Sequence, residues 1–277
     1  TYAYDFEWMN KALFYGQYIR LQSYFQNSDL AATGLPSAQE SAILKPYLQQ
    51  LPPLQRQGVL GQWKYPVSDA SGFNRTNLLI ARNILLKAGY RFKNAQLLDL
   101  KGQPIRIEFL VSDLAEQPSL LPFVRNLKKL GIQVSIRLVD TPQYTERMRN
   151  YDFQMTTLDM PQSLTPSSEQ QQMWGSQAAV EIGNYNYAGV KSPVVDHLVQ
   201  QVMQASNRDQ LVIRTRALDR VLRAGYYQIL TYGSDQKHFA YWNMYQQPSV
   251  QPKLSLGLDY WWVNVQKANQ VTPYLKK

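Results

Sequence analysis

The stretch that decides the fold is LGIQVSIRLVDTPQYTERMRNYDFQMTTLDMPQS, residues 130–163. Its pattern predicts an alternating strand over 133–140, a helix over 141–151 with Thr141 as its cap, and a short strand over 153–157. A strand that follows a helical crossover lies parallel to the strand before it. The stretch therefore predicts crossover units and a parallel sheet.

The flanking segments extend this pattern. Alternating apolar residues predict a strand over 104–113, and a helix over 118–131 that ends at Gly131 leads back to the next strand. The whole predicts an α/β fold, in which helices flank a largely parallel or mixed central sheet. The other expected features are helices over 5–16, 37–47, 71–90, 193–206 and 209–226, aromatic strands over 226–232 and 238–245, and an irregular stretch over 20–66.

The composition limits the available chemistry. The 277 residues include no cysteine, which excludes disulfides, cysteine-based zinc sites, iron–sulfur clusters and a thiol nucleophile. The two histidines are His197 and His238, and no GxSxG, GxxxxGK[ST], HExxH or GxGxxG motif occurs. We therefore expect no cofactor, and we favour binding over catalysis.

The charge balance narrows the partners. The 29 Lys and Arg outnumber the 20 Asp and Glu, for a net charge of +9, which fits nucleic acid, an anionic membrane or acidic ligands. These residues are scattered along the sequence rather than concentrated in a stripe, so nucleic-acid binding is not favoured. No run approaches the ~20 apolar residues of a membrane span. Aromatics reach 12%, which suits either an aromatic core or a site for peptides or sugars.

Polar side chains gather after the strand at 153–157. Ligands of open α/β sheets bind outside the carboxyl ends of parallel strands. The loop LDMPQSLTPSSEQQQMW and the segment GNYNYAG (183–189) follow that strand, either as a binding surface or as ordinary polar loops. The candidate ligand-binding residues in them are Asp159, Gln162, Ser163, Glu169, Trp174, Asn184 and Tyr185.

An enzymatic alternative uses the same loop. Asp159 and Glu169 are carboxylates that can pair as acid and base in a glycosidase. Because loop carboxylates are usually just solvated, the binding interpretation is favoured. If the alternative holds, the amide variant of either residue abolishes turnover.

Several pieces of the sequence occur in the order and spacing of a known family: DFEWMNKALFYGQYIRLQSYFQNSDLAATGLPS, SGFNRTNLLIARNILLKAGY, LKKLGIQVSIRLVDTPQYTERMRNYDFQM, AGVKSPVVDHLV and RALDRVLRAGYY. Over essentially the whole chain, it resembles the family 5 extracellular solute-binding proteins, and in particular their YejA-like branch. The resemblance implies a lobe of the type II periplasmic-binding-protein fold. It also implies an oligopeptide or peptide-like ligand, delivery to an inner-membrane ABC permease, and no enzymatic activity.

The resemblance further implies how the chain is organised. Family chains are longer and begin with an N-terminal lobe, so residues 1–235 correspond to the second ligand-binding lobe. Residues 236–277 correspond to the hinge return, near 232–239, and to a tail that packs on the N-terminal lobe absent from this chain. The implied location is the Gram-negative periplasm, reached through a signal peptide that this chain does not contain.

Two site residues depend on the resemblance. Peptide binders of this family often hold the ligand's α-amino group with an aspartate, and that position here falls on Gln162. Asp159 or Glu169 would then replace it, or the ligand lacks a free amino terminus. Tyr232 falls where the family places a ligand-contacting tyrosine beside the hinge.

Overall fold

The computed structural model describes residues 1–236, 238–252 and 255–275, and the chain divides into two compact units, Thr1–Gly233 and Ser234–Lys277. The first unit contains the parallel sheet and the main hydrophobic cores. In the described ranges, no helix is both long enough and apolar enough to cross a membrane. All the ligand-binding residues predicted from the sequence lie in the first unit.

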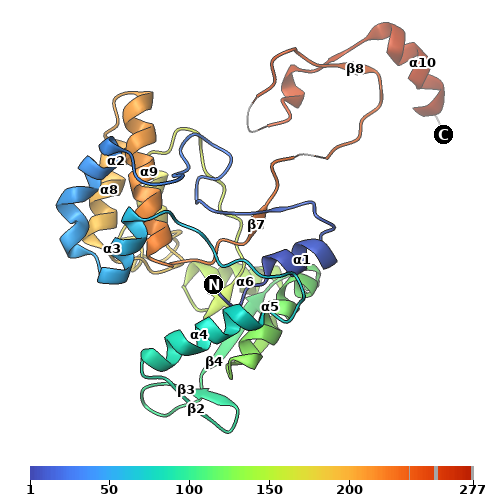
Figure 1. Cartoon of the computed structure of the whole chain (residues 1–277). Coiled ribbons are helices and arrows are strands. Elements are labelled where there is room, and N and C mark those ends of the chain that lie inside the picture. Colours follow the sequence, from blue (N-terminus) through green and yellow to red (C-terminus); the bar gives the residue numbers. More distant parts are fainter. Residues whose placement is uncertain (237, 253–254, 276–277) are drawn as a thin grey trace. The chain divides into compact units, whose positions relative to one another are not determined.

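A three-stranded parallel sheet lies in the first unit (Figure 1). Its central strand is β4 (Arg106–Val111), with β5 (Gln133–Leu138) on one side and β6 (Met155–Thr156) on the other. The helix α6 (Thr141–Arg149) connects β5 to β6. The parallel sheet predicted from residues 130–163 is therefore confirmed.

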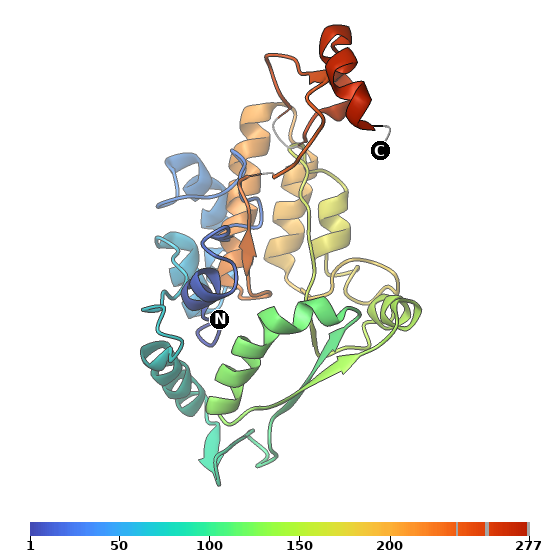
Figure 2. The same ribbon diagram turned by 90° about the vertical axis from the view of Figure 1, so that its right-hand side faces the viewer.

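Helices cover both faces of this sheet because β4 buries side chains on both of them. Phe109 and Val111 pack in one core with α5, and Leu110, which points the opposite way, packs in another with Met148 of α6. Figure 2 shows α5 beside the sheet. The helices that contribute to the first of these cores are α1 (Phe6–Ala12), α4 (Arg75–Lys87) and α5 (Gln117–Lys129).

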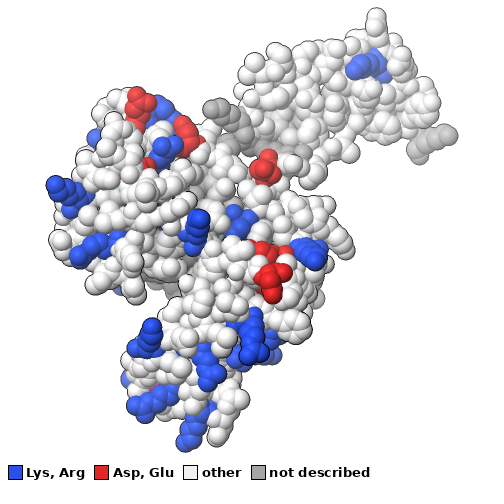
Figure 3. Space-filling view, in the orientation of Figure 1, with Lys and Arg blue, Asp and Glu red and all other residues white. Residues whose placement is uncertain are grey.

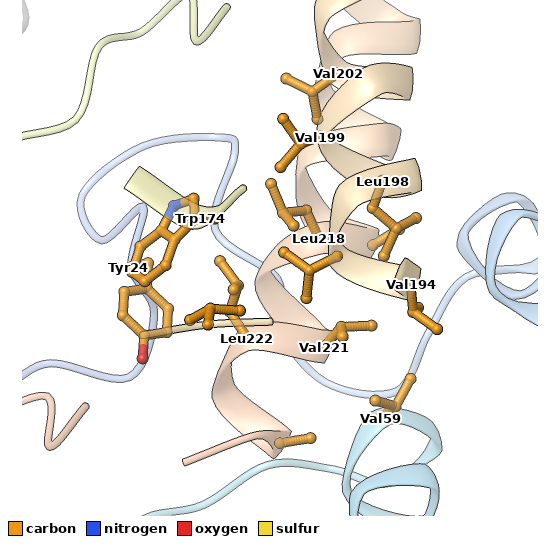
Figure 4. Close-up of a cluster of buried hydrophobic side chains, with 14 of the residues drawn as sticks. Tyr24, Val59, Trp174, Val194, Leu198, Val199, Val202, Leu218, Val221 and Leu222 are labelled. Carbon is orange, nitrogen blue, oxygen red and sulfur yellow. The ribbon is translucent and has the colours of Figure 1, made fainter. Parts of the chain in front are cut away.

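A second, helical core lies in the same unit (Figure 4). The fully buried Trp174 ring meets the Tyr24 ring edge-on, with 4.9 Å between their centroids. Leu198 and Leu218 come from two helices whose apolar residues recur every three or four positions. The helices of this group are α2 (Ala38–Leu44), α3 (Pro53–Leu60), α7 (Glu169–Trp174), α8 (Pro193–Met203) and α9 (Arg208–Ala224).

Two short antiparallel pairs complete the first unit. Strand β1 (Ile19–Arg20) pairs with β7 (Tyr232–Gly233), and β2 (Arg91–Lys93) forms a hairpin with β3 (Gln96–Leu98). The Leu97 N–H donates to the Gly131 carbonyl at 2.9 Å, which ties the hairpin to the end of α5. The remaining elements are η1 (Lys45–Gln50) and η2 (Leu114–Glu116) in the first unit and β8 (Tyr245–Gln246), η3 (Leu258–Tyr260), β9 (Trp262–Val263) and α10 (Val265–Leu275) in the second.

The strand predictions for the two aromatic segments are wrong over most of their length. In segment 226–232 only Tyr232 belongs to a strand, because Tyr226 has a φ of 53° and its N–H closes a turn on the Arg223 carbonyl. In segment 238–245 only the last residue belongs to a strand. Aromatic content alone therefore did not indicate extended backbone here.

Three further expectations need correction. The cap of α6 is Asp140 rather than Thr141, and its carboxylate accepts the Gln143 N–H at 2.8 Å. The stretch expected to be irregular over 20–66 contains α3, which begins at Pro53. The polar loop after β6 contains α7, because its last residues turn into a helix that buries Trp174.

Candidate functional site at the carboxyl edge of the sheet

Polar side chains follow β4 and β6 where both strands end, at one edge of the sheet. After β4, η2 carries Glu116, and the first turn of α5 carries Ser119. After β6, the Thr157 hydroxyl donates a hydrogen bond to the Glu116 carboxylate. The Ser119 hydroxyl donates to the Glu116 carbonyl at 2.7 Å. The Thr157–Glu116 bond joins the two chain segments that leave neighbouring strands, and the Ser119 bond holds the segment after β4.

Tyr232 lies beside these groups and keeps its proton. Burial raises the pKa of the Tyr232 hydroxyl, the Asp159 and Glu116 carboxylates raise it further, and a hydrogen bond with Ser119 opposes the rise. The neutral phenol can both donate and accept a hydrogen bond at physiological pH. Its ring packs against those of Phe14 and Tyr18, with centroid distances of 4.6 and 4.9 Å respectively.

The carboxyl groups at this edge have no ion-pair partner among the described residues. Asp159 is exposed, and neither Asp159 nor Glu116 forms an ion pair with a Lys or Arg among the described residues. The Glu116 carboxylate, which accepts the Thr157 hydroxyl, and the Asp159 carboxylate in the loop after β6 suit a ligand that carries an ammonium group and further hydrogen-bonding atoms. We call Glu116, Ser119, Thr157, Asp159 and Tyr232 the sheet-edge site.

Gln162 and Trp174 belong to a chain of hydrogen bonds that enters the helical core. Gln162 accepts a bond from the Gln170 amide at 2.7 Å, and Gln170 accepts one from the Trp174 indole N–H at 3.2 Å. Trp174 is 0% exposed. Its ring lies inside the core, so it has no exposed surface for the predicted ligand contact. Gln162 anchors the loop after β6 to α7 through Gln170.

Glu169 and Ser163 make local contacts. The Glu169 carboxylate accepts the Ser167 N–H at 2.9 Å at the start of α7, and the exposed Ser163 hydroxyl accepts the Thr165 N–H at 3.0 Å. No hydrogen bond joins Glu169 to Asp159 in the described ranges.

The segment 183–189 is held to α7. Asn184 donates to the Glu181 carboxylate at 3.0 Å, and the backbone N–H of Tyr185 donates to the Gln172 carbonyl at 3.2 Å. The Tyr185 side chain is 51% exposed. Tyr185 is therefore available at the surface, whereas Asn184 completes a local turn.

Three members of the sheet-edge site were missed by the sequence reasoning, namely Glu116, Ser119 and Thr157. The signal exists, because DLAEQPS (113–119) follows the strand predicted over 104–113. The rule applied to the loop after β6, that ligands meet the carboxyl ends of parallel strands, applies equally to this segment.

The parallel sheet between helices defines an α/β lobe of the type II periplasmic-binding-protein fold. One similar structure is NikZ from Campylobacter jejuni with Ni(L-His), at 13% identity and a TM-score of 0.60 over 83% of this chain and 40% of that one. A mannohexaose-bound periplasmic oligopeptide-binding protein from Thermotoga maritima has a TM-score of 0.58 at 14% identity, and the match covers 83% of this chain and 39% of that one. AppA from Bacillus subtilis in complex with a nonapeptide has a TM-score of 0.53 at 17% sequence identity, and the match covers 82% of this chain and 45% of AppA. Because these ligands are chemically unlike, the fold leaves the ligand class open.

The chain belongs to the family described as "Bacterial extracellular solute-binding proteins, family 5 Middle", which it matches over residues 1–181. A relative named "Probable peptide-binding protein YejA" from Agrobacterium fabrum is 40% identical over 95% of this chain and 42% of its own length. YejA of Escherichia coli K12 is 41% identical over 97% of this chain and 44% of its own length. The "Peptidoglycan-binding protein YepA" of A. fabrum is 33% identical over 95% and 42%. The chain spans less than half the length of these relatives, and the family resemblance is confirmed.

Proposed function

We propose that this chain is the second ligand-binding lobe of a solute-binding protein that captures oligopeptides or peptide-like compounds for an ABC importer. The family supports solute binding, and the name of the A. fabrum relative supports peptides. The proposed partners are the N-terminal lobe of the same protein and an inner-membrane permease in the Gram-negative periplasm. No cofactor, nucleic acid or reaction on the ligand is part of this proposal.

The observation that carries the proposal is the pair of uncompensated carboxylates in the sheet-edge site. A peptide with a free amino terminus carries an ammonium group, which Asp159 and Glu116 can hold by charge-assisted hydrogen bonds. The neutral Tyr232 hydroxyl can meet a peptide carbonyl or amide next to it. An extended peptide at this edge would use its backbone groups in the same way as an added strand.

Delivery would follow from closure of two lobes on the ligand. Ligand contacts made by both lobes stabilise the closed state, and the permease recognises that state. The second unit supports the presence of another surface, because large aromatic side chains in it are about half exposed. These side chains are Phe239, Tyr241, Trp242, Tyr260 and Trp262.

Peptides with free and acetylated amino termini test this site in the full-length protein. Asp159→Asn and Glu116→Gln should each weaken binding of the free-terminus peptide by about tenfold or more, since each removes a charged partner. Binding of the acetylated peptide should change little. Calorimetric titration measures both affinities.

Glu169→Gln is the matched control, because Glu169 makes local contacts at the start of α7. It should leave both affinities unchanged. Equal losses for free and acetylated peptides in the Asp159 and Glu116 variants would contradict the ammonium role. Hydrolysis of an oligosaccharide that disappears in Glu169→Gln would favour the glycosidase alternative.

A further inference from the structure

Most of the net positive charge of the protein lies in one part of the first unit. Residues 75–137 contain eleven Lys and Arg against four Asp and Glu, so this segment holds +7 of the net charge of +9. Of these four acids, Glu108 pairs with Arg147, and Glu116 lies in the sheet-edge site. Figure 3 shows Lys and Arg side chains over the lower part of the molecule, where Figure 1 places α4, β2 and β3. One continuous segment of the sequence therefore supplies most of the net charge and presents it on one part of the surface.

A groove of about 470 Å³ opens among these cations. Arg82 of α4, Lys93 of the hairpin, and Lys128 and Lys129 of α5 line it together with Phe92, and no acidic side chain lines it. The Arg82 guanidinium lies 4.7 Å from the centre of the Phe92 ring. Within the described part of the chain, none of these four cations forms an ion pair. This basic groove can therefore bind negatively charged groups from outside the protein.

Exposed leucines accompany the arginines on α4. Arg75, Leu79, Arg82 and Leu86 recur at intervals of four, three and four residues, which places them along one face of the helix. Leu79 is 47% and Leu86 is 43% exposed, and both arginines are exposed. A lipid bilayer matches this stripe, because its headgroups carry phosphate and its acyl chains lie just beneath them. A soluble polyanion such as DNA matches the arginines but leaves the leucines in water.

We propose that α4, the β2–β3 hairpin and the C-terminal end of α5 form a surface that binds anionic phospholipid membranes. Ser119 of the sheet-edge site and Lys129 of the basic groove lie at opposite ends of α5, about 15 Å apart along the helix axis. The two sites can therefore be occupied together. Membrane binding requires no peptide, so this inference stands or falls independently of the proposed ligand. Under the importer function, it would concentrate the protein near its permease.

Co-sedimentation of the protein with vesicles tests this surface. The protein should bind vesicles made of phosphatidylglycerol and phosphatidylcholine in equal parts, and it should not bind vesicles of pure phosphatidylcholine. High salt should release it from the mixed vesicles. Lys93→Glu with Lys128→Glu should lower the partition coefficient by about tenfold or more. Lys45→Glu with Lys191→Glu changes the net charge equally at exposed positions outside the surface and should keep most of the binding.

The contribution of the leucines separates lipid from other anions. Leu79→Ser with Leu86→Ser should weaken vesicle binding severalfold while circular dichroism stays unchanged. Full vesicle binding by the leucine variant would overturn a lipid surface in favour of general anion binding. Release of the unaltered protein by inorganic phosphate, at a concentration equal to that of the lipid phosphate, would overturn it in the same way. Equal losses in the two charge-reversal pairs would show that only net charge matters, and this would also overturn the proposal.

Discussion

Gly131 shows how one residue fixes two elements. It ends α5 with a φ of 72°, and a Cβ added there would lie 2.6 Å from the Leu97 nitrogen and 3.0 Å from the Gln96 carbonyl carbon. We expect Gly131→Ala to lower the free energy of unfolding by about 2–4 kcal/mol, because it adds backbone strain and displaces the β2–β3 hairpin. Urea denaturation measures the loss.

Gly102→Ala is the matched control for this prediction. Gly102 also has a left-handed backbone, with a φ of 80°, but no atom lies within 4 Å of a Cβ added there. Its substitution should cost only about 1 kcal/mol, the penalty of the conformation itself. Equal losses at the two glycines would show that the hairpin does not constrain Gly131.

Asp219 is the second residue with a large expected effect. It is fully buried in α9, and its carboxylate lies 3.4 Å from Nε of Arg223. It also accepts hydrogen bonds of 2.8 to 3.0 Å from the Ser23 hydroxyl and from the N–H groups of Tyr24 and Ala32. Asp219→Ala leaves these three donors without an acceptor and the buried Arg223 without its ion-pair partner, so we expect a loss of about 3–5 kcal/mol by urea denaturation.

The exposed Asp209, in the first turn of the same helix, provides the comparison for Asp219. Asp209→Ala should cost less than about 1 kcal/mol, since it removes only a favourable charge at the helix start. A similar loss at both positions would argue against the buried network. The sequence alone does not reveal this network, because the donors lie almost 200 residues away from Asp219.

At the scale of elements, the start of α6 distinguishes two caps. The Asp140 carboxylate accepts the Gln143 N–H at 2.8 Å, whereas the sequence predicts Thr141 as the cap. Asp140→Ala should therefore lower the free energy of unfolding by about 1 kcal/mol. Thr141→Ala should change it by less than about 0.5 kcal/mol. The reverse order in urea denaturation would contradict the cap seen in the structure.

The elements that could be predicted are those with long periodic patterns. The alternation in β4 and β5 and the helical spacing in α5 are strong enough to identify them from the sequence. The β2–β3 hairpin could not be identified, because its turn uses left-handed Asn94 and Ala95 instead of the usual Asn-Gly. Helix α3 was hidden by Pro53, which opens the helix instead of breaking it.

At the scale of the whole molecule, the sequence predicted the edge where polar groups meet but only part of the site. Asp159 and Tyr232 lie in the sheet-edge site, whereas Glu116 joins them only because β4 and β6 are neighbours in the sheet. Trp174 is in the helical core, since a tryptophan at a loop end gives no sign of its burial. The boundary between units falls after Gly233, and their roles as lobe and hinge return stay predictions.

The central claim is peptide capture, and calorimetric titration of the full-length protein with pooled short peptides tests it most directly. Duplex DNA and oligosaccharides serve as controls in the same buffer. We predict that the peptides alone bind, and that their affinity falls far less steeply with salt than polyanion binding does, because only the amino terminus is held by charge and neutral backbone hydrogen bonds supply the other contacts. Binding of an oligosaccharide or of DNA, with no response to any peptide, would contradict the account.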